Sequence, residues 1–127
     1  MPSRVEESDS SKEVPLKNTV DINELQISVE QLKQRIDAGN PPFLLDVREP
    51  YEREICNLGG RLIPLADLPE HIEELDPNGE IVVYCHTGRR SMRAVEFLHA
   101  SGFTDVKNLV GGVTAWAQRI DPDMPTY

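Results

Sequence analysis

The sequence predicts an α/β domain in which helices flank both faces of a central, largely parallel β-sheet. Short apolar runs alternate along the chain with segments whose apolar residues recur every three to four positions, as in helices. One of these runs, residues 81–84, is apolar throughout, which is typical of a strand buried on both faces of a parallel sheet. The chain has 127 residues, which is enough for a single core but not for two.

Capping and turn residues divide the chain into elements. Ser28 is expected to cap the first helix, Gly39 to end it, and residues 76–79 to form the turn before the strand at 81–84. Strands are expected at the short apolar runs 43–47, 62–64, 81–84 and 106–110. Helices are expected from apolar spacing at 29–36, 50–55, 68–75, 91–98 and 114–120, with a tight turn at the glycine pair 111–112.

The N-terminal part of the chain differs in composition from the rest. Residues 1–24 contain scattered serines and charges without apolar periodicity, so they are predicted to form a flexible lead-in or linker. The folded domain is therefore expected to cover residues 25–127.

Charge, apolar content and cysteine number argue against several classes of protein. The chain has 22 Asp and Glu against 13 Lys and Arg, a net charge of -9, which disfavours nucleic acids and anionic membranes as partners. No apolar stretch approaches the about 20 residues that span a bilayer, and the N-terminus lacks the apolar segment of a signal peptide. Two cysteines cannot form a disulfide framework, and a functional free thiol requires a reducing compartment, so the cytoplasm is the expected location.

Cys85 is the candidate nucleophile of the chain. It directly follows the strand at 81–84, at the edge where parallel sheets bind ligands and where helix N-termini point. Although the chain is acidic, residues 81–95 contain no carboxylate. The basic side chains in this window are those of His86, Arg89, Arg90 and Arg93. Because positive neighbours and a helix N-terminus favour the thiolate form of a cysteine, Cys85 is predicted to react through its sulfur.

Several motifs occur in the order typical of a known family. They are Asp46-Val47-Arg48 followed by Glu52, the six-residue loop from Cys85 to Arg90 with Gly88 at its glycine position, and Leu109-Val110-Gly111-Gly112 followed by Ala115-Trp116. With these motifs the chain resembles a rhodanese domain from Leu25 onward. The resemblance implies a rhodanese-like fold and a sulfurtransferase activity in which Cys85 carries a transferable sulfur atom as a persulfide.

The resemblance also implies roles for the loop around Cys85. Its backbone N–H groups are expected to surround the persulfide anion, and Gly88 to supply the backbone freedom for the curl. Ser91 is expected to cap the following helix rather than to contact the sulfur, and His86 to line the loop rather than to act as a base. The residues predicted to bind the substrate are His86, Thr87, Gly88, Arg89, Arg90 and Ser91.

Other polar residues near the loop are expected to support the structure. Arg48 is predicted to pair with Glu52, while Asp46 holds neighbouring loop backbone. Cys56 stands in an uncharged segment and is predicted to be a packing residue. The cysteines and histidines lack the paired spacing of zinc ligands, so neither a metal nor a cofactor is expected.

A narrower resemblance concerns the partners of the domain. Residues 55–60 and the ending 116–127 are similar to the C-terminal rhodanese domain of adenylyltransferase/sulfurtransferase proteins, which serve molybdopterin or thiamine synthesis or tRNA thiolation. This similarity implies an adenylating domain upstream of Met1 and, as sulfur acceptor, the adenylated C-terminus of a ubiquitin-like sulfur carrier. The expected sulfur donor is thiosulfate or a protein persulfide.

Three alternatives remain open. The chain is either such a fused domain, a stand-alone thiosulfate sulfurtransferase, or a non-catalytic rhodanese module that binds a protein partner.

A cysteine-dependent phosphatase or arsenate reductase on the same fold typically uses Cys-x5-Arg, in which the arginine clamps the phosphate. Here the sixth residue after Cys85 is Ser91, and Arg90 comes one position early. The loop is therefore expected to suit a single sulfur atom better than a phosphate.

Overall fold

The parallel sheet forms the centre of the domain. A computed structural model describes residues 21–127. The strands are β1 Gln26–Ile27, β2 Phe43–Asp46, β3 Arg61–Leu62, β4 Ile81–Tyr84 and β5 Val106–Leu109. They are hydrogen-bonded in the order β1-β5-β4-β2-β3, and all four neighbouring pairs are parallel. The predicted fold class is confirmed, and β4, which leads into Cys85, is the central strand.

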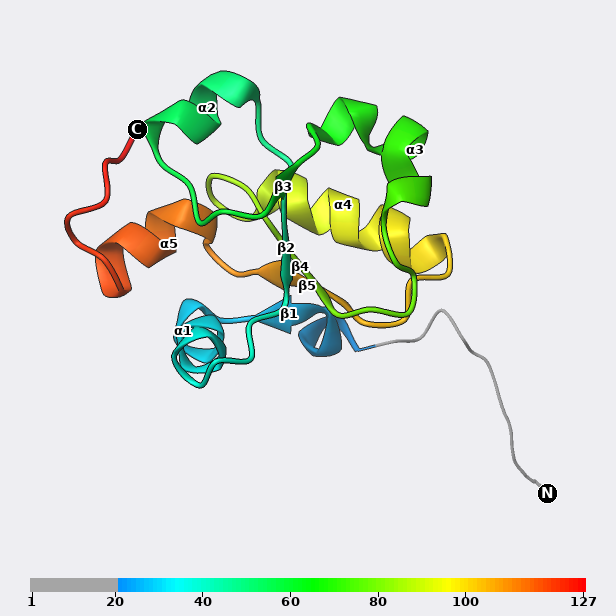
Figure 1. The fold of residues 1–127 in the computed structure, drawn as a ribbon, viewed down its shortest axis with the longest axis horizontal. Coiled ribbons are helices and arrows are strands. Elements are labelled where there is room, and N and C mark those ends of the chain that lie inside the picture. The colour runs from blue at the N-terminus through cyan, green and yellow to red at the C-terminus, as the bar shows by residue number, and fades with distance from the viewer. Residues whose placement is uncertain (1–20) are drawn as a thin grey trace.

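Helices cover both faces of this sheet, as predicted. The α-helices are α1 Val29–Asp37, α2 Pro50–Ile55, α3 Leu68–His71, α4 Arg89–Ala100 and α5 Gly112–Arg119. Figure 1 shows the sheet nearly edge-on, with α1 and α5 on one side and α3 and α4 on the other. No helix in the described part of the chain is long and apolar enough to cross a membrane.

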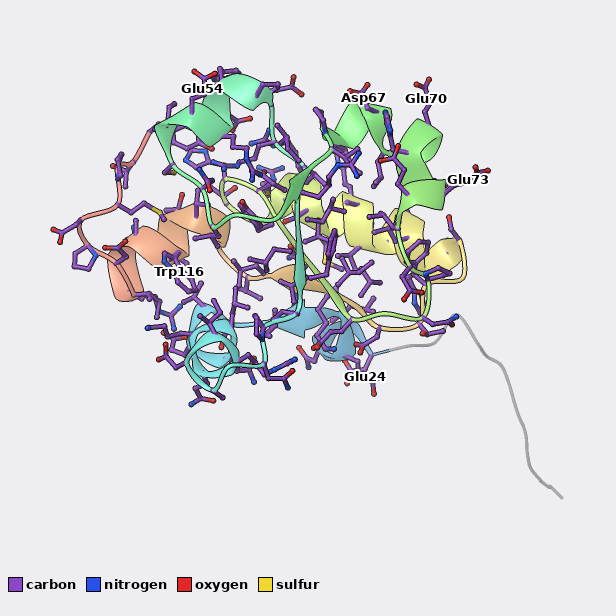
Figure 2. The ribbon with its side chains drawn as sticks, in the orientation of Figure 1. Glu24, Glu54, Asp67, Glu70, Glu73 and Trp116 are labelled. Carbon is purple, nitrogen blue, oxygen red and sulfur yellow. The ribbon has the colours of Figure 1, made fainter. Side chains whose placement is uncertain are left out.

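The side chains of β4 alternate between the two apolar layers. Val82 and Tyr84 pack in the layer beneath α1 and α5, which includes Trp116, and Figure 2 shows Trp116 on the side of α5 that faces α1. Ile81 and Val83 pack in the opposite layer with α4. All four strand residues are buried, which explains their continuous apolar character.

One strand was not predicted, and one predicted helix is interrupted. The strand β1 was not predicted, because a strand of two residues is too short to show an apolar alternation. It pairs with Asn108 and Leu109 at the edge of the sheet. The helix predicted over 68–75 is interrupted: α3 ends at His71, and the 3-10 helix η3 Ile72–Glu74 follows. Two further 3-10 turns are η1 Ile22–Leu25 and η2 Leu65–Asp67.

Two helices begin earlier than predicted. Helix α4 starts at Arg89 and α5 at Gly112, and the residues that precede them are glycines with φ of 100° and 80°. A glycine in this conformation lets the chain turn directly from a loop into a helix without a capping side chain. Of the predicted lead-in 1–24, residues 1–20 lie outside the described part, and residues 22–24 belong to η1.

Candidate active site

The sulfur of Cys85 is contacted by polar hydrogens of the loop and of the first turn of α4. Cys85 follows β4 directly and is only 1% exposed. Its Sγ atom accepts the backbone N–H of Gly88 at 3.1 Å and that of Ser91 at 3.3 Å. The hydroxyl Oγ of Ser91 lies 3.3 Å from the same sulfur. Two backbone N–H donors and one hydroxyl group thus converge on one atom, which is the arrangement that stabilises a sulfur anion.

The backbone of Gly88 brings this loop close to the sheet. Its φ is 100°, and a Cβ atom built on it would lie 3.1 Å from the backbone nitrogen of Gly111. A side chain at this position would therefore strain both the loop and its neighbour. Gly88 is also the residue before the first turn of α4, and in this turn the N–H of Ser91 donates to Cys85.

The capping role predicted for Ser91 is wrong. Because α4 already begins at Arg89, Ser91 lies within its first turn, fully buried, with its hydroxyl directed to the sulfur. The hydroxyl also donates to the side-chain oxygen of Asn108 on β5 at 2.5 Å, so this oxygen competes with the sulfur for the one hydroxyl proton. If the Asn108 amide turns over, its NH2 group donates to Ser91, and the serine proton becomes available to the sulfur. Asn108 is buried, and the sequence analysis missed it because its contact joins β5 to helix α4, 17 positions away along the chain.

The turn at Gly111 and Gly112 and the start of α5 hold the backbone of the loop that begins at Cys85. The backbone N–H of Val113 donates to the carbonyl of Cys85 at 3.0 Å, and that of Thr114 to the carbonyl of His86 at 3.1 Å. A Cβ atom on Gly112, whose φ is 57°, would collide with both of these carbonyls. The first two carbonyls of the loop that begins at Cys85 are thereby bound by the backbone of α5. The predicted tight turn at Gly111 and Gly112 thus has a specific task, which its motif alone did not reveal.

Arg90 is engaged in an ion pair with Glu52. Its two guanidinium nitrogens lie 2.7 and 2.8 Å from the two oxygens of the Glu52 carboxylate, which is 3% exposed. The bidentate bond from Arg90 lowers the pKa of Glu52 to about 2, against the opposing effect of burial. The predicted pairing of Glu52 with the Arg48 side chain is wrong. Arg48 reaches Glu52 only at its backbone carbonyl, at 3.4 Å, and not at its carboxylate. A pattern of residue types cannot tell which of two arginines reaches a carboxylate.

Asp46 and Arg48 form a fully buried pair at the end of β2. The Arg48 guanidinium donates to both oxygens of Asp46, at 2.9 Å each. As predicted, Asp46 also holds loop backbone, because it accepts the N–H of Arg48 at 3.1 Å. Arg48 further donates to the carbonyl of Cys56 at 2.7 Å, so that one side chain joins β2 to the segment after α2. Within residues 21–127, no hydrogen bond joins either side chain to Cys85, which fits the structural role predicted for the pair.

The exposed side of the active loop carries Thr87 and Arg89. Both side chains are exposed, and no ion pair of Arg89 occurs within residues 21–127. His86 is half-buried, and its ring stacks on that of Tyr127, with 3.9 Å between ring centroids and 8° between ring planes. The sequence analysis missed Tyr127, since no local pattern marks a contact between residues this far apart.

Cys56 belongs to a different part of the core from Cys85. It is 7% exposed and packs in the layer with α1 and α5, whereas Cys85 packs in the layer with α4. The predicted packing role of Cys56 is confirmed, and both thiols are free. Within residues 21–127, no group of three His, Cys, Asp or Glu side chains is arranged to hold a metal ion.

The comparison with known proteins agrees with this geometry. Residues 28–119 match the model of the rhodanese-like domain. The chain belongs to the rhodanese-like family. It is similar to "Adenylyltransferase and sulfurtransferase MOCS3-1" of Zea mays, with 37% identity over 110 residues. It is also similar to "Putative sulfur carrier protein YrkF" of Bacillus subtilis, with 37% identity over 97 residues.

A solved structure shares the fold. The crystal structure of a rhodanese-like domain protein from Staphylococcus aureus superposes with a TM-score of 0.68 at 28% identity, over 80% of this chain and 97% of that one. The matched part is 80% of this chain but only 24% of the maize relative, and 76% of this chain but 52% of the Bacillus relative. The chain is therefore related to sulfur-transfer proteins through this one domain.

Proposed function

We propose that this rhodanese-like domain is a sulfurtransferase that carries sulfane sulfur as a persulfide on Cys85, in the cytoplasm. The observation that carries the proposal is the convergence of the two N–H groups and the Ser91 hydroxyl on Cys85 Sγ. A persulfide ends in an anionic sulfur, which is stabilised by donors that are already oriented. The names of the related proteins support the same class of reaction.

The transfer consists of two displacements at sulfur. In the first, the Cys85 thiolate attacks the outer sulfur of thiosulfate; the sulfur–sulfur bond breaks, and sulfite leaves with the electron pair. In the second, a nucleophilic acceptor such as cyanide attacks the outer sulfur of the persulfide, and Cys85 leaves again as a thiolate. A protein persulfide serves equally as donor, with its own cysteine thiolate as the leaving group. Neither step requires a base if Cys85 is ionised, which fits a His86 whose ring is stacked rather than directed at the sulfur.

The arrangement of Arg90 disfavours phosphatase chemistry. A phosphate clamp needs a guanidinium that closes on the oxygens above the thiolate. The Arg90 guanidinium is instead bound at both nitrogens by Glu52, and the next residue, Ser91, is buried against the sulfur. The loop therefore offers N–H donors to one sulfur atom rather than a cationic clamp to three oxygens.

For the acceptor, we propose the adenylated C-terminus of a ubiquitin-like sulfur carrier, in a pathway of the molybdopterin or thiamine type. Because this acceptor is an electrophile, the terminal sulfur of the Cys85 persulfide attacks the acyl-adenylate carbonyl, and AMP leaves. An external thiol then attacks Cys85 Sγ in the resulting acyl disulfide, which releases the carrier thiocarboxylate and leaves a mixed disulfide on Cys85 that a second thiol reduces. The support is the adenylyltransferase named in the maize relative and the sulfur carrier named in the Bacillus relative. Arg89 is exposed beside the loop, so its charge is available to attract an anionic acceptor. On this proposal an adenylating domain works together with the chain.

The reaction class is tested with the purified protein and two substrates. We expect thiocyanate to form from thiosulfate and cyanide, and no hydrolysis of p-nitrophenyl phosphate above a sample without enzyme. Thiocarboxylate formation on an adenylated carrier, detected by mass spectrometry, tests the acceptor separately. Phosphate ester hydrolysis without sulfur transfer would contradict the proposed class. Thiocyanate formation without any transfer to the carrier would favour a stand-alone thiosulfate sulfurtransferase.

A further inference from the structure

The segment after α5 folds back to the active-site side of the molecule. Figure 1 shows it running from the end of α5 to a position beside α2, where the chain ends. The segment is tied down along its way, because the N–H of Asp121 donates to the carbonyl of Trp116 at 2.9 Å and that of Met124 to the carbonyl of Asp121 at 3.1 Å. Met124 packs against the apolar layer beneath α5. These contacts hold the end of the segment, and with it Tyr127, beside α2 and the active-site loop.

Tyr127 makes two different contacts there. Its ring stacks on His86 with 3.9 Å between the centroids. Its hydroxyl donates to the Glu52 carboxylate at 2.8 Å and accepts from the Arg48 guanidinium at 3.0 Å. Burial raises the pKa of Tyr127 to about 12, so the hydroxyl keeps its proton at neutral pH and remains a donor to Glu52.

These contacts reach both ends of the loop that surrounds the sulfur. His86 immediately follows Cys85. Glu52 holds Arg90, which immediately precedes Ser91, whose N–H and hydroxyl contact the sulfur. A displacement of Tyr127 therefore releases the loop at its first residue and weakens the support of its last turn.

Packing alone does not account for this placement. Tyr127 keeps 40% of its surface exposed, so its contribution to the apolar core is small. Its polar atom is nonetheless bonded to two charged and buried side chains. Tyr127 lines a small pocket of about 10 Å³ together with Cys56 and His86.

We infer that Tyr127 is a positioning residue for the sulfur-transfer loop: it fixes His86 by stacking and Arg90 through Glu52, and so keeps the donors aimed at Cys85. The inference rests on the proposed sulfurtransferase function. Tyr127 itself touches neither Cys85 nor, on this account, the substrate. Its effect is therefore expected on the rate of transfer rather than on the binding of thiosulfate.

The test compares Tyr127→Leu, which removes both contacts, with Tyr127→Phe, which keeps the ring. For Tyr127→Leu we expect the kcat of thiosulfate–cyanide transfer to fall about tenfold while its KM changes less than about twofold. Hydrogen–deuterium exchange of the loop amides 86–91 is expected to become about tenfold faster, with exchange in β4 and β5 unchanged. Tyr127→Phe is expected to recover most of the loop protection.

Tyr51→Leu is the matched control, since Tyr51 is 65% exposed and precedes Glu52 on α2. It is expected to leave kcat and loop exchange unchanged. Unchanged loop exchange in Tyr127→Leu, or equally faster exchange throughout the sheet, would overturn the positioning role. Because exchange is measured without any substrate, it still decides this inference if the wild-type protein transfers no sulfur, a result that would refute only the proposed function.

Discussion

Cys85→Ala is expected to abolish sulfur transfer from thiosulfate to cyanide, with a loss of more than about 1000-fold in rate, because no other group of the site can hold the sulfur covalently. The change removes one buried sulfur atom, so the fold should persist with a loss of about 1 kcal/mol in the free energy of unfolding. Thiocyanate formation measures the first effect, and thermal unfolding followed by circular dichroism the second.

Cys56→Ala is the matched control for this experiment. Cys56 is buried like Cys85 but packs on the other face of the sheet. Its replacement should cost similar stability and leave the transfer rate within about threefold of the wild type. Full activity in Cys85→Ala, or loss of activity in Cys56→Ala alone, would refute Cys85 as the sulfur-carrying residue.

Glu52→Gln is expected to lower the free energy of unfolding at pH 7 by about 2 kcal/mol, after allowance for the solvent around Arg90. Glu52 is 3% exposed and receives both guanidinium nitrogens of Arg90 together with the Tyr127 hydroxyl. An amide offers Arg90 one neutral oxygen in place of a charged pair. The bidentate bond is therefore lost, while the size of the side chain is retained.

The same pair predicts a pH dependence of stability. The pKa of Glu52 is about 2 in the folded protein, against an ordinary glutamate pKa of 4.5. Since the folded value is depressed, the stabilisation is fully present above about pH 4.5 and is lost as the pH falls toward 2. The difference in unfolding free energy between the wild type and Glu52→Gln should therefore shrink over this range. Urea titrations at several pH values measure it.

Glu54→Gln, two residues further along α2, is the control. Figure 2 shows Glu54 on the outer side of α2, pointing away from the core, and it is exposed. Its replacement should change the free energy of unfolding by less than about 0.5 kcal/mol at any of these pH values. An equal effect of both substitutions, or a difference for Glu52→Gln that stays constant down to pH 2, would contradict the assigned ion pair.

The sheet and the position of Cys85 were predictable because their signals are local. The apolar run of β4 leads directly into Cys85, and a fully buried central strand requires such a run. Helix α2 has its predicted bounds, since Pro50 is a favoured first residue of a helix. By contrast, the two residues of β1 obtain their strand conformation from pairing with β5, which no pattern within Gln26–Ile27 expresses.

Side-chain partners within the site were less predictable than its backbone. The sequence brings Asp46, Arg48, Glu52 and Arg90 together as two acids and two arginines, and either pairing satisfies the charges. In the structure Arg48 pairs with Asp46 and Arg90 with Glu52, according to where the end of β2 and the first turns of α2 and α4 place these residues. Likewise, Ser91 changes from a cap to a sulfur contact because Gly88 lets α4 begin two residues earlier. Long-range geometry decides both cases.

The location of the transferred sulfur tests the central claim most directly. The intact wild-type protein is treated with thiosulfate, freed of excess reagent and analysed by mass spectrometry, followed by peptide mapping under non-reducing conditions. We predict a gain of one sulfur atom, located on Cys85, which dithiothreitol or cyanide removes and which Cys56→Ala still acquires. A gain located on Cys56 alone, or no gain in a correctly folded protein, would contradict the account of Cys85 as the persulfide carrier.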